Sequence, residues 1–181
     1  MLLAVGGHSR KIGKTSVAAG LIAALRDFNW TALKITCHHQ YELREEHQPD
    51  AGDSARFLAA GAQRSFWLRT GNLRDALPEI ARIRTLGPNT IIESNSILEF
   101  LEPDLYIMVL DFACEDFKPS AARYLDRADA VVVIDHGLSS PNWKDIPQGL
   151  WESKPRFSAS PPVYTPPALS AFVRQRFFPA G

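Results

Sequence analysis

The chain has 181 residues, and its 20 Lys and Arg residues balance 20 Asp and Glu residues, so the formal net charge is zero. Hydrophobic residues make up 45% and charged residues 22%, which is typical of one globular domain. Balanced charge argues against bulk attraction to nucleic acid. No apolar run approaches the roughly 20 residues that cross a bilayer, and two cysteines cannot form a disulfide framework. We therefore expect a cytoplasmic protein that binds neither nucleic acid nor membrane.

Apolar runs typical of buried strands alternate with stretches that have helical spacing. In chain order, strands are expected at 2–6, 30–36, 65–68, 90–92, 105–110 and 130–134. Helices are expected at 15–27, 53–60, 73–85 and 119–127. The polar stretch 37–52 contains three of the five histidines and is expected to be a loop. Strands alternating with helices predict an α/β fold of three layers, with a mostly parallel sheet and helices on both faces.

The last 41 residues, from Pro141, hold 8 of the 13 prolines. Because proline lacks an amide donor, this segment is expected to be largely irregular, extended over the domain, and to end in a short helix near 168–177. The sequence therefore predicts a ligand-binding domain at 1–140 and a proline-rich tail at 141–181 that packs on the same domain.

Polar or small residues end several of the expected strands. They are Gly6, Lys34, Glu93, Asp111 and Asp135. Ligands of parallel sheets bind beyond the carboxyl ends of the strands, so these residues mark the expected site. The first 26 residues contain no acidic residue, and this basic start would suit an anionic ligand held together with a divalent metal.

Between the first strand and the first helix lies a segment that ends in Gly13-Lys14-Thr15, the end of a phosphate-binding loop. In such loops the lysine reaches the terminal phosphates and the threonine hydroxyl binds Mg²⁺. The first glycine of the motif would fall at His8, and Gly7 stands one residue earlier, so the loop is one residue longer than usual. The residues expected to surround the phosphates are Lys11, Ile12, Gly13, Lys14, Thr15 and Ser16.

Three carboxylates are candidates for the nucleotide site. Glu93 ends a strand and could hold Mg²⁺ with Thr15, whereas the alternative is a solvent-facing strand end. Asp53 could approach the γ-phosphate through metal and water, or could only cap a helix. Asp135 could read a base edge, but the Asn-Lys-x-Asp sequence of guanine-specific proteins is missing, so GTP and ATP both stay open.

The stretch 37–52 and the lysine before it are candidates for substrate binding. Lys34, His38 and His39 could contact an anionic substrate. Cys37, His38, His39 and His47 could alternatively bind zinc, although adjacent histidines tend to point apart and no second cysteine pair completes the site.

The loop from Gly7 to Thr15 resembles that of dethiobiotin synthetase, in which the first glycine also stands six places before the second. Other segments resemble MobB, the GTP-binding protein of molybdopterin guanine dinucleotide biosynthesis: 34–39, 53–56, 60–62 and 91–93. The glutamate at 93 is followed by Ser94-Asn95 rather than by glycine, and the early lysine of the MinD type is replaced by Ser9. The chain thus resembles the MinD and dethiobiotin synthetase superfamily of P-loop NTPases, and most of all MobB.

This resemblance implies a P-loop NTPase fold that binds Mg²⁺ with GTP or ATP. A MobB-like protein would be a GTP-binding accessory of molybdenum cofactor biosynthesis that serves a partner enzyme. A dethiobiotin-synthetase-like protein would be an ATP-dependent ligase or kinase for a small carboxylate metabolite. A third alternative is a nucleotide-dependent interaction switch in which 37–52 orders around the γ-phosphate, and a fourth is a structural protein without nucleotide. Members of these families are commonly dimers, which implies a homodimer.

Overall fold

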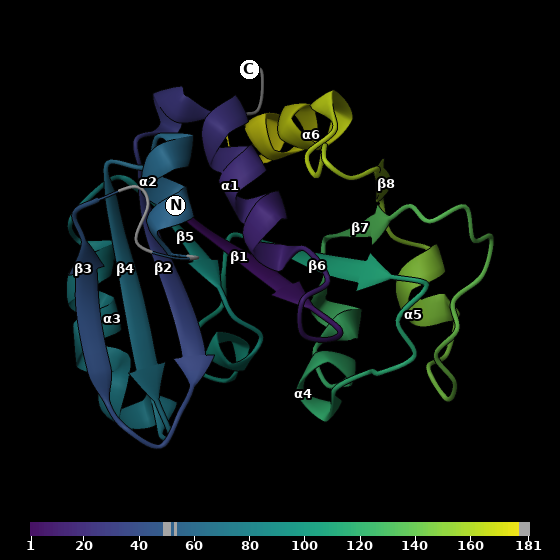
Figure 1. Cartoon of the computed structure of the whole chain (residues 1–181), viewed down its shortest axis with the longest axis horizontal. Helices are drawn as coiled ribbons and strands as arrows, with labels where there is room; N and C mark the ends of the chain where they lie inside the picture. The colour runs from purple at the N-terminus through teal and green to yellow at the C-terminus, as the bar shows by residue number, and fades with distance from the viewer. Residues whose placement is uncertain (49–51, 53, 178–181) are drawn as a thin grey trace.

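The computed structural model describes residues 1–48, 52 and 54–177, and its centre is an eight-stranded sheet (Figure 1). The strands are β1 (Leu2–Gly7), β2 (Trp30–Cys37), β3 (Glu42–Glu46), β4 (Arg64–Thr70), β5 (Asn89–Glu93), β6 (Leu105–Asp111), β7 (Ala130–Ile134) and β8 (Arg156–Ala159). Their order across the sheet is β3-β4-β2-β5-β1-β6-β7-β8. The pairing of β3 with β4 is antiparallel, and the other pairs are parallel.

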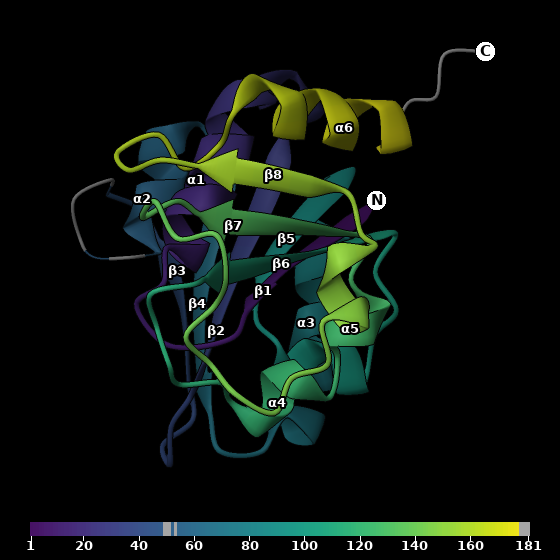
Figure 2. The same ribbon diagram turned by 90° about the vertical axis from the view of Figure 1, so that its right-hand side faces the viewer.

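Helices cover both faces of the sheet (Figures 1 and 2). One face is covered by α1 (Lys14–Ala24), α2 (Ala55–Ala60) and α6 (Pro167–Phe177), and the other by α3 (Leu77–Arg84), α4 (Pro119–Ala122) and α5 (Gly149–Glu152). Short 3₁₀ helices occur at 26–28, 73–76, 96–99 and 125–127. Across the described part of the chain, every helix is too short or too polar to span a membrane. The predicted three-layer α/β fold is confirmed.

The central strand β1 is buried on both faces. Leu3 and Val5 belong to the apolar cluster beneath α1 and α6, whereas Leu2 and Ala4 belong to the cluster beneath α3. Burying each such leucine contributes about 1.5–3 kcal/mol relative to exposing it. Because β1 lies between β5 and β6, its last residue is held at the middle of the carboxyl edge of the sheet, where the loop to α1 begins.

The expectation that 37–52 is a loop is wrong for the residues of β3. Leu43 is the one apolar residue of this strand, so its sequence has no hydrophobic alternation to indicate a strand. Pairing with β4 is supported by ion pairs, in which Arg69 lies 3.0 Å from Glu42 and Arg64 lies 2.6 Å from Glu45. Charged side chains are typical of an edge strand, because they discourage pairing with another chain.

The proline-rich segment is more regular than expected, since it supplies β8 to the sheet beside β7 and the short helix α5. It ends in α6, which packs on α1. Between β8 and α6 the Thr165 hydroxyl donates to the Val17 carbonyl at 3.2 Å. A Cβ atom on Gly20 would overlap Thr165, so the glycine allows this close approach. Residues far apart in the sequence therefore lie side by side along α1.

Replacement of Leu169 by alanine tests whether the C-terminal segment is part of the domain. Leu169 on α6 is fully buried, so Leu169→Ala is expected to lower the free energy of unfolding by about 2–5 kcal/mol in urea titrations. Leu138→Ala removes the same atoms from a side chain that is 40% exposed, and should change the free energy of unfolding by less than about 0.5 kcal/mol. Equal effects of the two variants would contradict the packing of α6.

Candidate functional site

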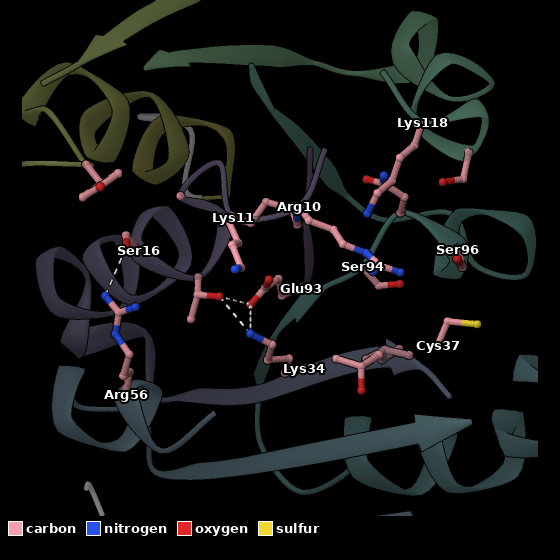
Figure 3. Close-up of a pocket in the computed structure, with 18 residues that line it drawn as sticks. Arg10, Lys11, Ser16, Lys34, Cys37, Arg56, Glu93, Ser94, Ser96 and Lys118 are labelled. Atoms are coloured by element: carbon pink, nitrogen blue, oxygen red, sulfur yellow. Dashed lines mark hydrogen bonds and ion pairs between the residues drawn. The ribbon is translucent and has the colours of Figure 1, made fainter. Parts of the chain in front are cut away.

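A cavity of about 830 Å³ opens at the carboxyl edge of the sheet, which is within the usual size range of small-molecule sites (Figure 3). Cationic side chains dominate its lining: Arg10, Lys11, Lys14, Lys34, Arg56 and Lys118. Among the described lining residues, Glu93 is the one carboxylate. An excess of cations in a partly enclosed space favours an anionic ligand.

The N-terminus of α1 faces this cavity. Gly13 caps the helix with a φ of +92°, in the left-handed region that suits glycine, and a Cβ atom there would lie 2.7 Å from the Tyr164 ring. Thr15 and Ser16 line the cavity together with Lys14. The first amides of a helix have no acceptor within the helix, so this turn is a ready binding site for phosphate oxygens.

Gly7 acts as the first glycine of the loop. A Cβ atom on Gly7 would lie 2.7 Å from Cγ of Lys14, so the lysine side chain crosses the loop over this residue and donates to the Ser9 carbonyl at 2.5 Å. The Asn95 side chain completes the hydrogen bonding of Gly7, because its oxygen accepts from the Gly7 amide at 2.8 Å and its nitrogen donates to the Gly7 carbonyl at 2.9 Å.

The ammonium group of Lys14 is poorly solvated. Burial lowers its pKa to about 8, an effect that Glu93 opposes and that Lys118 and Lys34 reinforce. Lys14 is therefore mostly charged at neutral pH but lacks full compensation for its lost hydration. A phosphate group beside it would supply that compensation.

Thr15, Glu93 and Lys34 form one contact group at the end of β5. The Thr15 hydroxyl donates to the Glu93 carboxylate at 2.7 Å, and the Lys34 ammonium donates to the Thr15 hydroxyl at 3.0 Å and lies 3.5 Å from the carboxylate. A hydroxyl and a carboxylate are oxygen ligands of the kind that Mg²⁺ prefers. The Lys34 ammonium lies beside both oxygens, so the two oxygens accept a cation together, and their donor chemistry fits a magnesium ion.

Not all of the predicted site residues line the cavity. Ile12 is buried in the core beneath α1. His38 and His39 are exposed, and the His38 ring accepts from the Gln40 amide at 3.2 Å. Asp135 is also exposed, and its carboxylate accepts from the Gly137 amide at 2.8 Å. These four are absent from the described lining.

Two further predictions concern Asp53 and a zinc site in the stretch 37–52. Asp53 lies outside the described residues, so its predicted place near the γ-phosphate stays a prediction. The described residues (1–48, 52 and 54–177) contain no group of three or more His, Cys, Asp or Glu side chains that could hold a metal ion such as zinc.

Sequence reasoning missed several residues of the cavity. Asn95 follows β5 by two residues, and its amide side chain at a strand end was the available signal. Arg10 lies inside the loop itself. Arg56 belongs to the MobB-like segment 53–56 but was not predicted to line the site. Lys118 and Tyr164 come from distant segments, and their sequence context does not mark them. Arg56 reaches α1 by donating to the Ser16 hydroxyl at 3.1 Å.

His8 joins the loop to the segment that follows β6. Its Nε2 accepts from the Asp111 amide at 3.0 Å, so its Nδ1 carries the proton and donates to the Asp116 carbonyl at 2.9 Å. The ring lies 5.0 Å from that of Phe117 and 4.8 Å from that of Trp143, measured between centroids. Burial lowers the pKa of His8, and the hydrogen bond to the Asp116 carbonyl opposes this lowering. The neutral ring is thus a structural link.

A mostly parallel sheet, with Lys14 and Thr15 at the start of the helix that follows the central strand, defines a P-loop NTPase fold. Two solved structures share this fold. LpxK from Aquifex aeolicus, solved in complex with ATP, matches with a TM-score of 0.54 and 17% identity, over 87% of this chain and 53% of LpxK. HypB from Helicobacter pylori, solved in complex with nickel, matches with a TM-score of 0.53 and 15% identity, over 97% of this chain and 86% of HypB.

This chain therefore spans about half the length of LpxK. No known family model matches the sequence, and neither does any curated protein. At these identities the two structures show the fold, while the finer resemblance to MobB rests on the sequence segments alone.

The neutral state of His8 predicts a pH-dependent stability. The pKa of His8 is lowered in the folded protein. The contribution of the neutral ring to the free energy of unfolding is therefore complete above the pKa of the unfolded chain, about 6.5, and is lost as the pH falls toward the lowered pKa of the folded state. The free energy of unfolding of the wild type should thus fall between about pH 7.5 and about pH 5.5. In His8→Gln that slope should be smaller, whereas in His39→Gln, which changes an exposed ring, it should persist. Identical slopes in wild type and His8→Gln would disprove the link.

Proposed function

We propose that this protein binds a nucleoside triphosphate with Mg²⁺ at the loop between β1 and α1. The observation that carries the proposal is the arrangement of Lys14, Thr15 and Glu93 around one cationic cavity. Lys14 holds the outer phosphates, and the first-turn amides of α1 hold the inner ones. Thr15 and Glu93 are the residues that would hold the metal.

A magnesium ion held by Thr15 and Glu93 would neutralise charge on the phosphates and on the leaving group. The chain's own residues do the remaining work. Lys14 compensates the charge that develops on the outer phosphates, and its loss of hydration makes this interaction stronger than it would be in water. Lys34 lies 3.0 Å from the Thr15 hydroxyl and so brings a second cation to the same place.

The nucleoside is proposed to lie at the end of the cavity formed by Ser16, Arg56 and Tyr164. Tyr164 packs against Gly13, and its ring also lines the cavity, so a base or ribose beyond the inner phosphates would meet it. An aromatic face accepts adenine and guanine alike, which agrees with the choice between ATP and GTP left open by the sequence. Asp135 follows Ile134, which lies near Gly13, and stays a candidate for reading the base edge.

Two roles of the bound nucleotide are considered. A MobB-like accessory that binds GTP for a partner enzyme in molybdenum cofactor biosynthesis is supported by the sequence segments that include Lys34 and Glu93. A ligase or kinase acting on a small carboxylate is supported by the cavity itself, which continues beyond Lys14 and Glu93 along Thr36, Cys37 and other residues. Room beside the terminal phosphate favours the second role.

In that role, an acceptor carboxylate oxygen forms a bond to the terminal phosphorus. The bond from that phosphorus to the bridging oxygen breaks, and the nucleoside diphosphate leaves with the electron pair. No proton has to move, because a carboxylate is already ionised at neutral pH. The described lining holds no histidine, which agrees with an acceptor that needs no deprotonation.

The interaction switch has less support. It required 37–52 to order around the γ-phosphate, but residues 42–46 of that stretch form β3 and pair with β4. The ion pair of Arg64 with Glu45 holds this strand in the sheet.

The proposed site is tested by titrating the protein with ATP and with GTP in the presence of Mg²⁺ by calorimetry. Lys14→Ala should weaken binding by about 10- to 100-fold, because a charge-assisted hydrogen bond to phosphate contributes about 1.5–3 kcal/mol. Removing Mg²⁺ with EDTA should weaken it as well. Lys144→Ala, a change at an exposed lysine outside the cavity, should leave the affinity unchanged. Unchanged affinity in Lys14→Ala, or no binding of either nucleotide, would refute the proposal.

The place of the nucleoside is tested by Tyr164→Ala. Loss of stacking is expected to weaken nucleotide binding by about fivefold or more, since base stacking on an aromatic ring contributes about 1–3 kcal/mol. Binding of inorganic tripolyphosphate, which has no base, should be unaffected. Tyr41→Ala serves as the matched control, because that ring is 53% exposed and lies outside the cavity. Equal weakening for tripolyphosphate would place Tyr164 elsewhere.

A further inference from the structure

The cavity has a second end that lies away from the proposed nucleoside. In Figure 3, Ser16 and Arg56 lie at one end of the cavity, whereas Cys37, Ser96 and Lys118 lie at the other. Thr36, the chain neighbour of Cys37, and Ser120, two residues after Lys118, also line the cavity. We therefore define the distal compartment by Thr36, Cys37, Ser96, Lys118 and Ser120. These residues come from β2, from the 3₁₀ helix at 96–99 that follows β5, and from the start of α4.

The terminal phosphate of the proposed nucleotide would face the distal compartment. In phosphate loops the helix amides hold the inner phosphates and the lysine reaches the outer ones. Here the Lys14 side chain crosses Gly7 and its ammonium reaches the Ser9 carbonyl, so it leads away from Ser16. Gly7 is hydrogen bonded to Asn95, the neighbour of Ser96 in the chain. The outer phosphates and the distal compartment therefore adjoin.

Lys118 is fixed in position relative to the phosphate loop. Its backbone amide donates to the His8 carbonyl at 2.8 Å, and the preceding residue, Phe117, packs on the His8 ring. The Ser9 hydroxyl donates to the Asp116 carboxylate at 2.5 Å, which ties the same segment to the loop a second time. The backbone position of Lys118 is thus fixed by contacts with the loop that would hold the phosphates.

The distal compartment combines positive charge with hydroxyl groups. Lys118 is partly buried, and its pKa is lowered by burial and by Arg10. A half-buried cation of this kind is stabilised by an anion. Arg10 and Lys34 line the adjoining part of the cavity, and the hydroxyl donors of the compartment belong to Thr36, Ser96 and Ser120. Such a lining suits a small molecule with an anionic group and hydroxyl or other polar groups.

We propose that the distal compartment binds the acceptor substrate, a small polar carboxylate metabolite, and that Lys118 binds an anionic group of this metabolite, either the carboxylate itself or a phosphate that it also carries. The inference rests on the proposed function, because it places the acceptor beside the terminal phosphate of a bound nucleotide. Lys118 is then a substrate-binding residue, and His8 is a positioning residue that acts through the segment 111–118.

The experiment first saturates the protein with Mg²⁺ and a non-hydrolysable analogue of ATP or GTP, so that the phosphate loop is occupied. Succinate and glycerol 3-phosphate are then titrated in by calorimetry as carboxylate and phosphate probes, and erythritol serves as an uncharged probe. Saturable binding of one anionic probe, but not of erythritol, is expected, and the probe that binds identifies the anionic group. Lys118→Met should weaken this binding about tenfold or more, whereas Lys118→Arg should keep it within about threefold.

Lys144→Met is the matched control, since it removes an exposed lysine outside the cavity and should leave probe binding unchanged. The affinity of each variant for the nucleotide analogue is measured first, which also reports correct folding, and the probes are then titrated at an analogue concentration that saturates that variant. No saturable binding of either anionic probe to the wild type, or equal binding to wild type and Lys118→Met, would overturn the inference. Failure of the wild type to bind the nucleotide analogue would instead overturn the proposed function.

Discussion

The structure depends on how the chain leaves the central strand at Gly7 and His8. A phosphate loop has to keep its later amides open to a ligand, and still needs enough hydrogen bonds to stay in place. Here the bonds are made at the start of the loop. Asn95 pairs with both backbone groups of Gly7, while His8 donates to the Val109 carbonyl and accepts from the Lys118 amide. The remainder of the loop, up to α1, can then surround an anion.

The same arrangement gathers buried positive charges in the cavity, where they lower the stability of the protein unless an anion binds beside them. Lys14 and Lys118 both have lowered pKa values because of burial and neighbouring cations. Glu93 offsets part of this charge, and it is itself held by Thr15 and Lys34. The zero net charge of the chain thus conceals a strongly cationic cavity. An anionic ligand and a metal ion would each replace interactions that the protein now makes within itself.

The sequence predicted those features that depend on neighbouring residues. The apolar run of β1, followed by Lys14 and Thr15 and then by helical spacing, indicated both the fold and the loop, and Glu93 was recognisable at the end of a strand. The strand β3 could not be predicted, because its support comes from partners on β4 such as Arg69. Lys118 and Tyr164 reach the cavity through tertiary contacts that leave no local pattern in the sequence.

The close contact of the C-terminal segment with α1 has a consequence for synthesis of the protein. Tyr164 forms one wall of the cavity at Gly13, and Thr165 packs on Gly20, about two helical turns further along the chain. The loop precedes Tyr164 in the chain, and the segment that carries β2 to β8 lies between them. A nascent chain can therefore pair β1 with both of its neighbours once β5 and β6 have been made, but the cavity is complete only after Tyr164 has followed.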